Sequence, residues 1–227
     1  MKWSKIADHP AVYTILGDVG SGKTVTACSI IDEFRIDHKL KVYMVDYKYV
    51  VDKFPKWFIY ANPEKPRIGK KSIIFVDDAH QHHYARDWMK GKGKKLDIIA
   101  RERRQSDVSI VYTTQQARVL DVNLISMSSC IVFKRPSKLQ LKVERKEIKE
   151  MYVIADQALK EGGYKVNKAY VVSNDYEGIV TVKKPKWFTT KMSKAHDRIN
   201  PEEKPLNPKK LVKPILSIIK QIGRLID

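Results

Sequence analysis

The sequence predicts an α/β fold with a central, mostly parallel β-sheet. Apolar segments typical of strands alternate with segments typical of helices as far as residue 134. A glycine-rich segment, residues 17–24, follows the first apolar run, and a later apolar run ends on Asp77 and Asp78. A chain of 227 residues holds one such core, so a second full domain is not expected.

The predicted strands are short runs rich in β-branched and aromatic residues, bounded by turn residues. They cover residues 11–16, 41–46, 57–60, 72–76, 108–114 and 130–134. Helices are expected at 25–34, 85–89 and 96–105, with a loop at 90–95. A long charged helix at 143–161, ended by two glycines, should precede a β-hairpin made of residues 169–173 and 179–183.

The glycine-rich segment matches the phosphate-loop pattern Gly-x4-Gly-Lys-Thr without a mismatch. Gly20 and Gly22 allow backbone angles that turn successive N–H groups toward phosphate oxygens. Lys23 would place its charge on the β- and γ-phosphates, and the Thr24 hydroxyl is a ligand suited to Mg²⁺. The sequence therefore predicts binding of ATP with Mg²⁺. The residues expected to contact the nucleotide are Gly17, Asp18, Val19, Gly20, Ser21, Gly22, Lys23, Thr24 and Val25.

The strand at 72–76 has the form of a Walker B strand, because its apolar residues lead directly into two acids. Asp77 is expected to hold the magnesium ion. Asp78 stands where many such ATPases carry a glutamate that orients the attacking water, although aspartate is one methylene shorter. The alternative is a buried strand followed by a solvated acidic turn.

Three further strand ends resemble those of the FtsK–HerA superfamily of P-loop ATPases. Asp46-Tyr47-Lys48 resembles an Asp-Pro-Lys motif, Thr114-Gln115 resembles a polar sensor, and Lys134-Arg135-Pro136 resembles the end of the last core strand. The resemblance covers residues 11–136. Within the superfamily the chain is most similar to small genome-packaging ATPases of tailless double-stranded DNA viruses, with the Zot-like morphogenesis ATPases of filamentous phages as close relatives.

The resemblance implies a RecA-like sheet in which the strand at 108–114 lies between the phosphate-loop strand and the acidic strand. Gln115 would then contact the γ-phosphate or the attacking water. It also implies a homo-oligomeric ring, a hexamer or a pentamer, in which an arginine of one subunit completes the neighbouring site. The candidates, in order, are Arg104, Arg101 and Arg103. A solvated basic helix face is the alternative for these arginines.

The charge of the chain indicates a polyanionic partner. There are 44 Lys and Arg against 26 Asp and Glu, a net charge of +18. Four lysines interleaved with glycines form a loop suited to the backbone of double-stranded DNA, since ammonium groups contact phosphates without reading bases. A merely solvated loop is the alternative. The lysines are Lys90, Lys92, Lys94 and Lys95.

The domain organisation predicted is an ATPase domain at 1–183, a loosely structured Pro- and Lys-rich linker at 184–213, and an amphipathic helix at 214–227. The helix would dock on a capsid protein or an anionic membrane, or alternatively on the ATPase core. No apolar run approaches the ~18 residues of a spanning helix, which predicts a cytoplasmic protein of the host cell, associated with the virion or a membrane through this helix.

The function predicted is ATP hydrolysis by a DNA-translocating ring that packages a viral genome into its capsid. A Zot-like ATPase for virion assembly or extrusion at a membrane is one alternative. A nucleotide-dependent DNA-binding switch with little turnover is the other.

Overall fold

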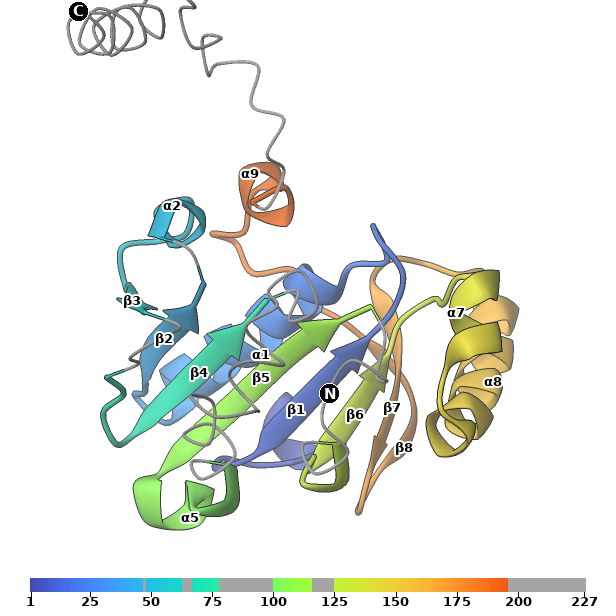
Figure 1. The fold of residues 1–227 in the computed structure, drawn as a ribbon, viewed down its shortest axis with the longest axis horizontal. Coiled ribbons are helices and arrows are strands. Elements are labelled where there is room, and N and C mark those ends of the chain that lie inside the picture. Colours follow the sequence, from blue (N-terminus) through green and yellow to red (C-terminus); the bar gives the residue numbers. More distant parts are fainter. Residues whose placement is uncertain (47, 63–66, 78–99, 116–124, 196–227) are drawn as a thin grey trace, which may run out of the picture. The chain divides into compact units, whose positions relative to one another are not determined.

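A computed structural model describes residues 1–46, 48–62, 67–77, 100–115 and 125–195. Its centre is an eight-stranded sheet with the strand order β3-β2-β4-β5-β1-β6-β7-β8 (Figure 1). Strands β3 to β6 in this order are parallel, whereas β7 and β8 are antiparallel to their neighbours. The predicted α/β class is confirmed. The strands are β1 (Val12–Leu16), β2 (Lys41–Val45), β3 (Phe58–Ala61), β4 (Ser72–Val76), β5 (Val108–Thr114), β6 (Cys130–Phe133), β7 (Lys168–Ser173) and β8 (Glu177–Thr181).

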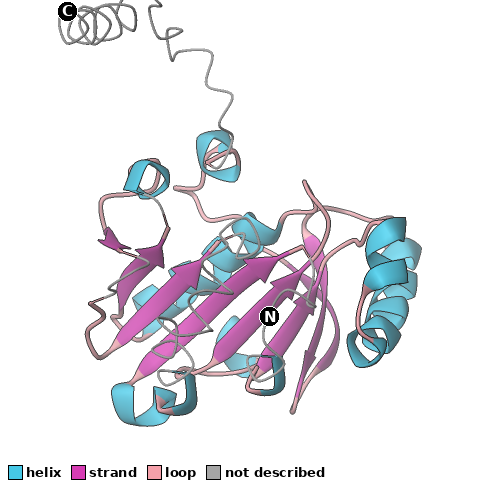
Figure 2. Cartoon of the chain, in the orientation of Figure 1, coloured by secondary structure: helices cyan, strands magenta, loops and turns pink. Residues whose placement is uncertain are grey.

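Helices lie on both faces of the sheet (Figure 2). Helix α1 (Lys23–Asp37) covers one face, where the rings of Tyr13 and Phe34 lie 5.8 Å apart. Helix α8 (Lys146–Glu161) packs on β6 and β7 with Tyr152 against Phe133, at 4.8 Å between ring centroids. The short helices are η1 (Trp3–Lys5), α2 (Lys48–Val51), α5 (Arg103–Ser106), α7 (Lys138–Val143) and α9 (Thr190–Ser193).

Strand β5 lies between β1 and β4, as the resemblance implied. In the parallel register Leu16 is opposite Thr114, and Val76 is opposite Tyr112. All five residues of β1 and β4, and all seven of β5, are buried, which explains why these strands are rich in apolar residues on both faces. The carboxyl ends of the three strands therefore meet at one edge of the sheet.

The predicted long helix at 143–161 is wrong at its beginning, because two helices occupy this part of the chain. Ser137 caps α7 with a capping box: its Oγ accepts from the Gln140 N–H, and the Gln140 Oε1 accepts from the Ser137 N–H. Glu144 is extended and ends α7 before α8 begins at Lys146. The hairpin of β7 and β8 is confirmed. Of the helix predicted at 96–105, residues 100 and 101 are helical, residue 102 forms a turn, and α5 covers Arg103–Ser106; residues 96–99 lie outside the described residues.

Part of the predicted loose linker is packed. The indole N–H of Trp187 donates a 2.8 Å hydrogen bond to Asp32 on α1, and its ring lies 5.0 Å from that of Trp57. Phe188 and Met192 are buried. The compact unit that holds the sheet accordingly runs from Met1 to Ser193, and Lys194–Asp227 form a second unit.

The predicted helix at 214–227 lies outside the described residues, as do residues 196–213 of the linker. Within the part of the chain that the structure describes, no helix combines the length and the apolar character needed to cross a membrane.

Candidate nucleotide-binding site

The loop between β1 and α1 requires glycine at two positions for different reasons. Gly22 has φ of +92°, in the left-handed region that side chains disfavour. A Cβ at Gly17 would lie 2.6 Å from the Cβ of Lys134 and from Oγ of Ser21, so only glycine fits there. The first turn of α1 follows directly. Its N-cap is Gly22, which has no side chain to occupy the free N–H groups, so they can bind an anion.

The carbonyl of Asp18 organises the inside of this loop. It accepts hydrogen bonds from the N–H and the hydroxyl of Ser21, at 3.2 and 2.7 Å, and from the ammonium of Lys23 at 3.0 Å. Lys23 is only 7% exposed. Its charge is therefore held against the loop, where phosphate oxygens would enter.

A cluster of oxygens lies beside the start of α1. Both carboxylate oxygens of Asp77 accept from the Thr24 hydroxyl, at 3.3 and 3.2 Å. Oδ1 of Asp77 also accepts from the Thr113 hydroxyl at 2.6 Å. Asp77 is 3% exposed. Hydroxyl and carboxylate oxygens are the ligands that Mg²⁺ prefers, so Thr24 and Asp77 fit the predicted magnesium ion.

Gln115 lies at the same edge of the sheet, one residue past β5. Its carbonyl oxygen accepts a hydrogen bond from the Gln140 amide, which also reaches the Tyr152 hydroxyl at 3.4 Å. Gln140 is buried. The end of the predicted sensor strand is therefore linked to both α7 and α8.

The three candidate arginines lie away from this cluster. Helix α5 precedes β5, so Arg103 and Arg104 lie at the amino end of that strand, opposite the edge that carries the phosphate loop (Figure 1). Arg101 and Arg104 are exposed, whereas Arg103 is half-buried and donates to the Ala100 carbonyl at 2.9 Å. The fold thus separates the arginines from Lys23 of the same chain.

Several predicted site residues lie outside the described residues. They are Asp78, Lys90, Lys92, Lys94 and Lys95.

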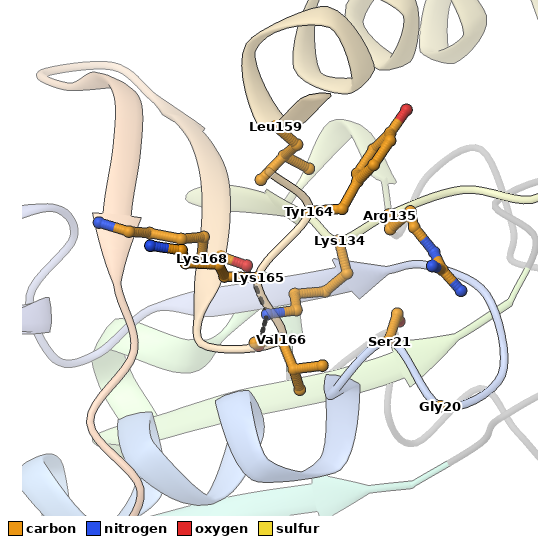
Figure 3. A pocket seen from close by; sticks show the side chains of 9 residues that line it. All are labelled: Gly20, Ser21, Lys134, Arg135, Leu159, Tyr164, Lys165, Val166 and Lys168. Atoms are coloured by element: carbon orange, nitrogen blue, oxygen red, sulfur yellow. Dashed lines mark hydrogen bonds between the residues drawn. The ribbon is translucent and has the colours of Figure 1, made fainter. Parts of the chain in front are cut away.

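Sequence reasoning missed Thr113 and Lys134. The hydroxyl residues at the end of the strand at 108–114, Thr113 and Thr114, were the available signal for Thr113. Lys134 is 1% exposed, and its ammonium donates to the carbonyls of Val166 and Lys168, at 2.7 and 2.6 Å (Figure 3). Burial lowers its pKa to about 8. Nothing in the linear sequence indicated that this lysine reaches a loop more than thirty residues away.

A small pocket of about 60 Å³ opens next to Lys134. Gly20 and Ser21 of the phosphate loop form one side of it, and Tyr164 and Val166, from the segment between α8 and β7, form another (Figure 3). Arg135 lines it as well.

No protein-family model matches this sequence, and no curated protein matches it significantly. Solved structures do match. The genome-packaging NTPase B204 of Sulfolobus turreted icosahedral virus 2, in complex with AMPPCP, is 12% identical with a TM-score of 0.52, over 78% of this chain and 98% of that chain. This chain therefore shares the fold of that NTPase.

Two other solved structures have a similar fold. The pCW3 conjugation coupling protein TcpA, with ATPγS, is 12% identical with a TM-score of 0.53, over 78% of this chain and 61% of that chain. EssC (ATPases 2 and 3) from Geobacillus thermodenitrificans is 11% identical with a TM-score of 0.53, over 96% of this chain and 45% of that chain. The similarity at these identities is one of fold.

Proposed function

We propose that this protein is an ATPase that translocates double-stranded DNA as a homo-oligomeric ring and packages a viral genome in the cytoplasm of the host. The observation that carries the ATPase assignment is the meeting of Lys23, Thr24 and Asp77 at one sheet edge. The order β4-β5-β1 supports it, because the end of β5, which Gln115 follows, then lies beside both the phosphate loop and Asp77.

The proposed chemistry assigns a task to each residue. ATP with Mg²⁺ supplies the phosphoryl group that water attacks. Lys23 neutralises the β- and γ-phosphates, and Thr24 and Asp77 hold the ion. Thr113 orients the Asp77 carboxylate through its short hydrogen bond. We assign to Gln115 contact with the attacking water, and the hydrogen bond of its carbonyl with Gln140 supports a link to α7.

Packaging is supported by the fold and the charge. The likeness to B204, described as the DNA-packaging ATPase of Sulfolobus turreted icosahedral virus, extends over 98% of that chain and 78% of this one. The net charge of +18 suits a polyanionic track such as DNA. The segment at 214–227 would attach the motor to a capsid protein or an anionic membrane.

The test is ATP hydrolysis with and without double-stranded DNA, run beside a mass measurement of the assembly. We expect DNA-stimulated turnover that Lys23→Met abolishes and Asp77→Asn reduces, with far-UV circular dichroism unchanged in both variants. Turnover that persists in Lys23→Met would overturn the ATPase assignment.

The same assay separates the alternatives. A membrane-associated assembly ATPase would turn over ATP without stimulation by DNA, and truncation after Pro205 would abolish its sedimentation with anionic vesicles. Residues 183–227 carry twelve Lys and Arg against four Asp and Glu, which favours this as the second candidate. A DNA-binding switch would bind ATP and DNA with little turnover.

A further inference from the structure

We propose that Lys134 is a positioning residue of the nucleotide site: it holds the segment 164–168 beside the phosphate loop as a wall for the nucleoside end of the nucleotide. This proposal rests on the ATPase function proposed above. Lys134 follows β6 directly, and its side chain ends on carbonyls of a segment that belongs to the turn between α8 and β7.

The backbone around Lys134 is joined to the start of the phosphate loop. Its N–H donates to the carbonyl of Leu16 at 2.7 Å, and the N–H of Asp18 donates to the carbonyl of Arg135 at 2.9 Å. The side chain then extends the connection to Val166 and Lys168. One residue therefore links the phosphate loop to the segment that faces it.

The segment comes close enough to the loop to form a wall. A Cβ at Gly22 would lie 2.9 Å from Cγ1 of Val166 and 3.1 Å from its carbonyl oxygen, so Val166 fills the space above that glycine. Tyr164 is held on the same segment with its hydroxyl bonded to Asp156 at 2.8 Å. Its ring, rather than its hydroxyl, is the part available to the pocket (Figure 3).

The pocket shares Gly20 and Ser21 with the phosphate loop, so the ligand that reaches it is the one whose phosphates the loop holds. Most of the lysine charge around it is directed elsewhere: the Lys168 ammonium donates to Thr181 at 2.7 Å, and the side chains of Lys165 and Lys168 point away (Figure 3). The remaining lining combines Val166 and the ring of Tyr164 with the guanidinium of Arg135. A guanidinium stacks on planar rings as well as binding phosphates, so this lining can accept a sugar and a base.

The position of the pocket predicts that Lys134 affects binding of the nucleoside and not binding of the phosphates. It lies beside the loop, whereas Lys23, Thr24 and Asp77 act on the phosphates and the ion. Freeing the segment should weaken binding of ATP, because the segment must then be ordered at the expense of binding energy. Binding of inorganic tripolyphosphate, which has no nucleoside, should not change.

The experiment compares the wild type with Lys134→Met, which removes the ammonium and keeps the Cβ packed near Gly17. We expect the KM for ATP to rise about tenfold and kcat to stay within about twofold, with the inhibition constant of tripolyphosphate also within about twofold. Lys160→Met, which removes a lysine from the last turn of α8, is the matched control. It should change neither the KM for ATP nor the inhibition constant of tripolyphosphate.

An unchanged KM in Lys134→Met would overturn the proposal. Equal weakening of ATP and tripolyphosphate would also overturn it, because Lys134 would then act on the phosphate loop itself. If Lys134→Met does not fold, Val166→Ala shortens the same wall without adding charge at a residue that is 56% exposed, and the same selective weakening is expected. If the wild type hydrolyses no ATP, the proposed function fails, and calorimetric titration with ATP and with tripolyphosphate tests the wall separately.

Discussion

The hydroxyl of Thr113 donates a 2.6 Å hydrogen bond to Oδ1 of Asp77, so the carboxyl ends of β5 and β4 are joined at the candidate metal site. The same carboxylate lies 3.2 and 3.3 Å from the Thr24 hydroxyl of α1. Helix α1, strand β5 and the residue that follows β4 therefore meet at one buried carboxylate, that of Asp77.

Thr113→Val keeps the shape of the side chain and removes this hydrogen bond. We expect Mg²⁺ affinity or turnover to fall about 10- to 100-fold, as when other residues that orient a metal ligand are replaced. Initial rates measured across a series of Mg²⁺ concentrations test this. Thr181→Val makes the same change at an exposed position of β8 and should have no effect. Identical Mg²⁺ dependence in wild type and Thr113→Val would show that Asp77 needs no support from β5.

Arg104 should act only on the site of a neighbouring subunit, since α5 lies at the opposite edge of the sheet from its own phosphate loop. Arg104→Ala alone should be inactive. Mixed with inactive Lys23→Met subunits, it should regain activity at interfaces that pair an intact phosphate loop with an intact arginine. Native mass spectrometry would establish that mixed rings form. Mixed rings without recovery would exclude Arg104 as the finger, and Arg101→Ala would then be tested in the same way.

The four lysines of the basic loop should contribute to DNA binding without sequence preference. Replacing Lys90, Lys92, Lys94 and Lys95 with alanine should shrink the slope of log affinity against log salt by about 0.9 for each DNA phosphate that is no longer neutralised. ATP hydrolysis without DNA should persist. An unaltered salt slope would place the DNA path elsewhere on the protein.

The buried ammonium of Lys134 should make stability depend on pH in an alkaline window. Burial lowers its folded pKa from 10.5 to about 8, so between these values the unfolded chain binds more protons and stability rises with pH. The two carbonyl acceptors favour the charged form, which keeps the gain at or below about 3 kcal/mol.

Urea unfolding at pH 7.5 and at pH 10 measures this effect. The free energy of unfolding of the wild type should increase relative to that of Lys134→Met as the pH is raised. Lys160→Met, with its exposed lysine, should keep a constant difference from the wild type. A constant difference for Lys134→Met as well would mean that its amine titrates normally in the folded protein.

The sequence predicted the fold well where burial imposes a pattern. Strands β4 and β5 were predicted at their observed bounds, because every residue in them is buried and the apolar runs stop at turn residues. The start of α8 was misplaced because the apolar periodicity continues through Val143. The Ser137 and Gln140 pair, which is a readable capping signal, would have separated α7 from α8.

The site was predictable only where a motif fixes its residues. The phosphate loop and Asp77 carry such a motif. Thr113 and Lys134 act through contacts with residues far along the chain, 36 positions away for Thr113 and 32 for Lys134. A contact between residues so far apart produces no periodic pattern in a single sequence. The docking of Trp187 on Asp32, 155 positions away, was missed for the same reason.

The contact of Trp187 with Trp57 and Asp32 has a consequence for how the protein is made. The rings of Trp57 and Phe58 come early in the chain, yet the indole that covers them arrives only when residue 187 leaves the ribosome. Until then an aromatic surface beside strand β3 faces solvent or a chaperone. The last residues of the compact unit therefore cover the β3 edge of the sheet. A chain released before residue 187 would leave that aromatic surface exposed and prone to aggregation.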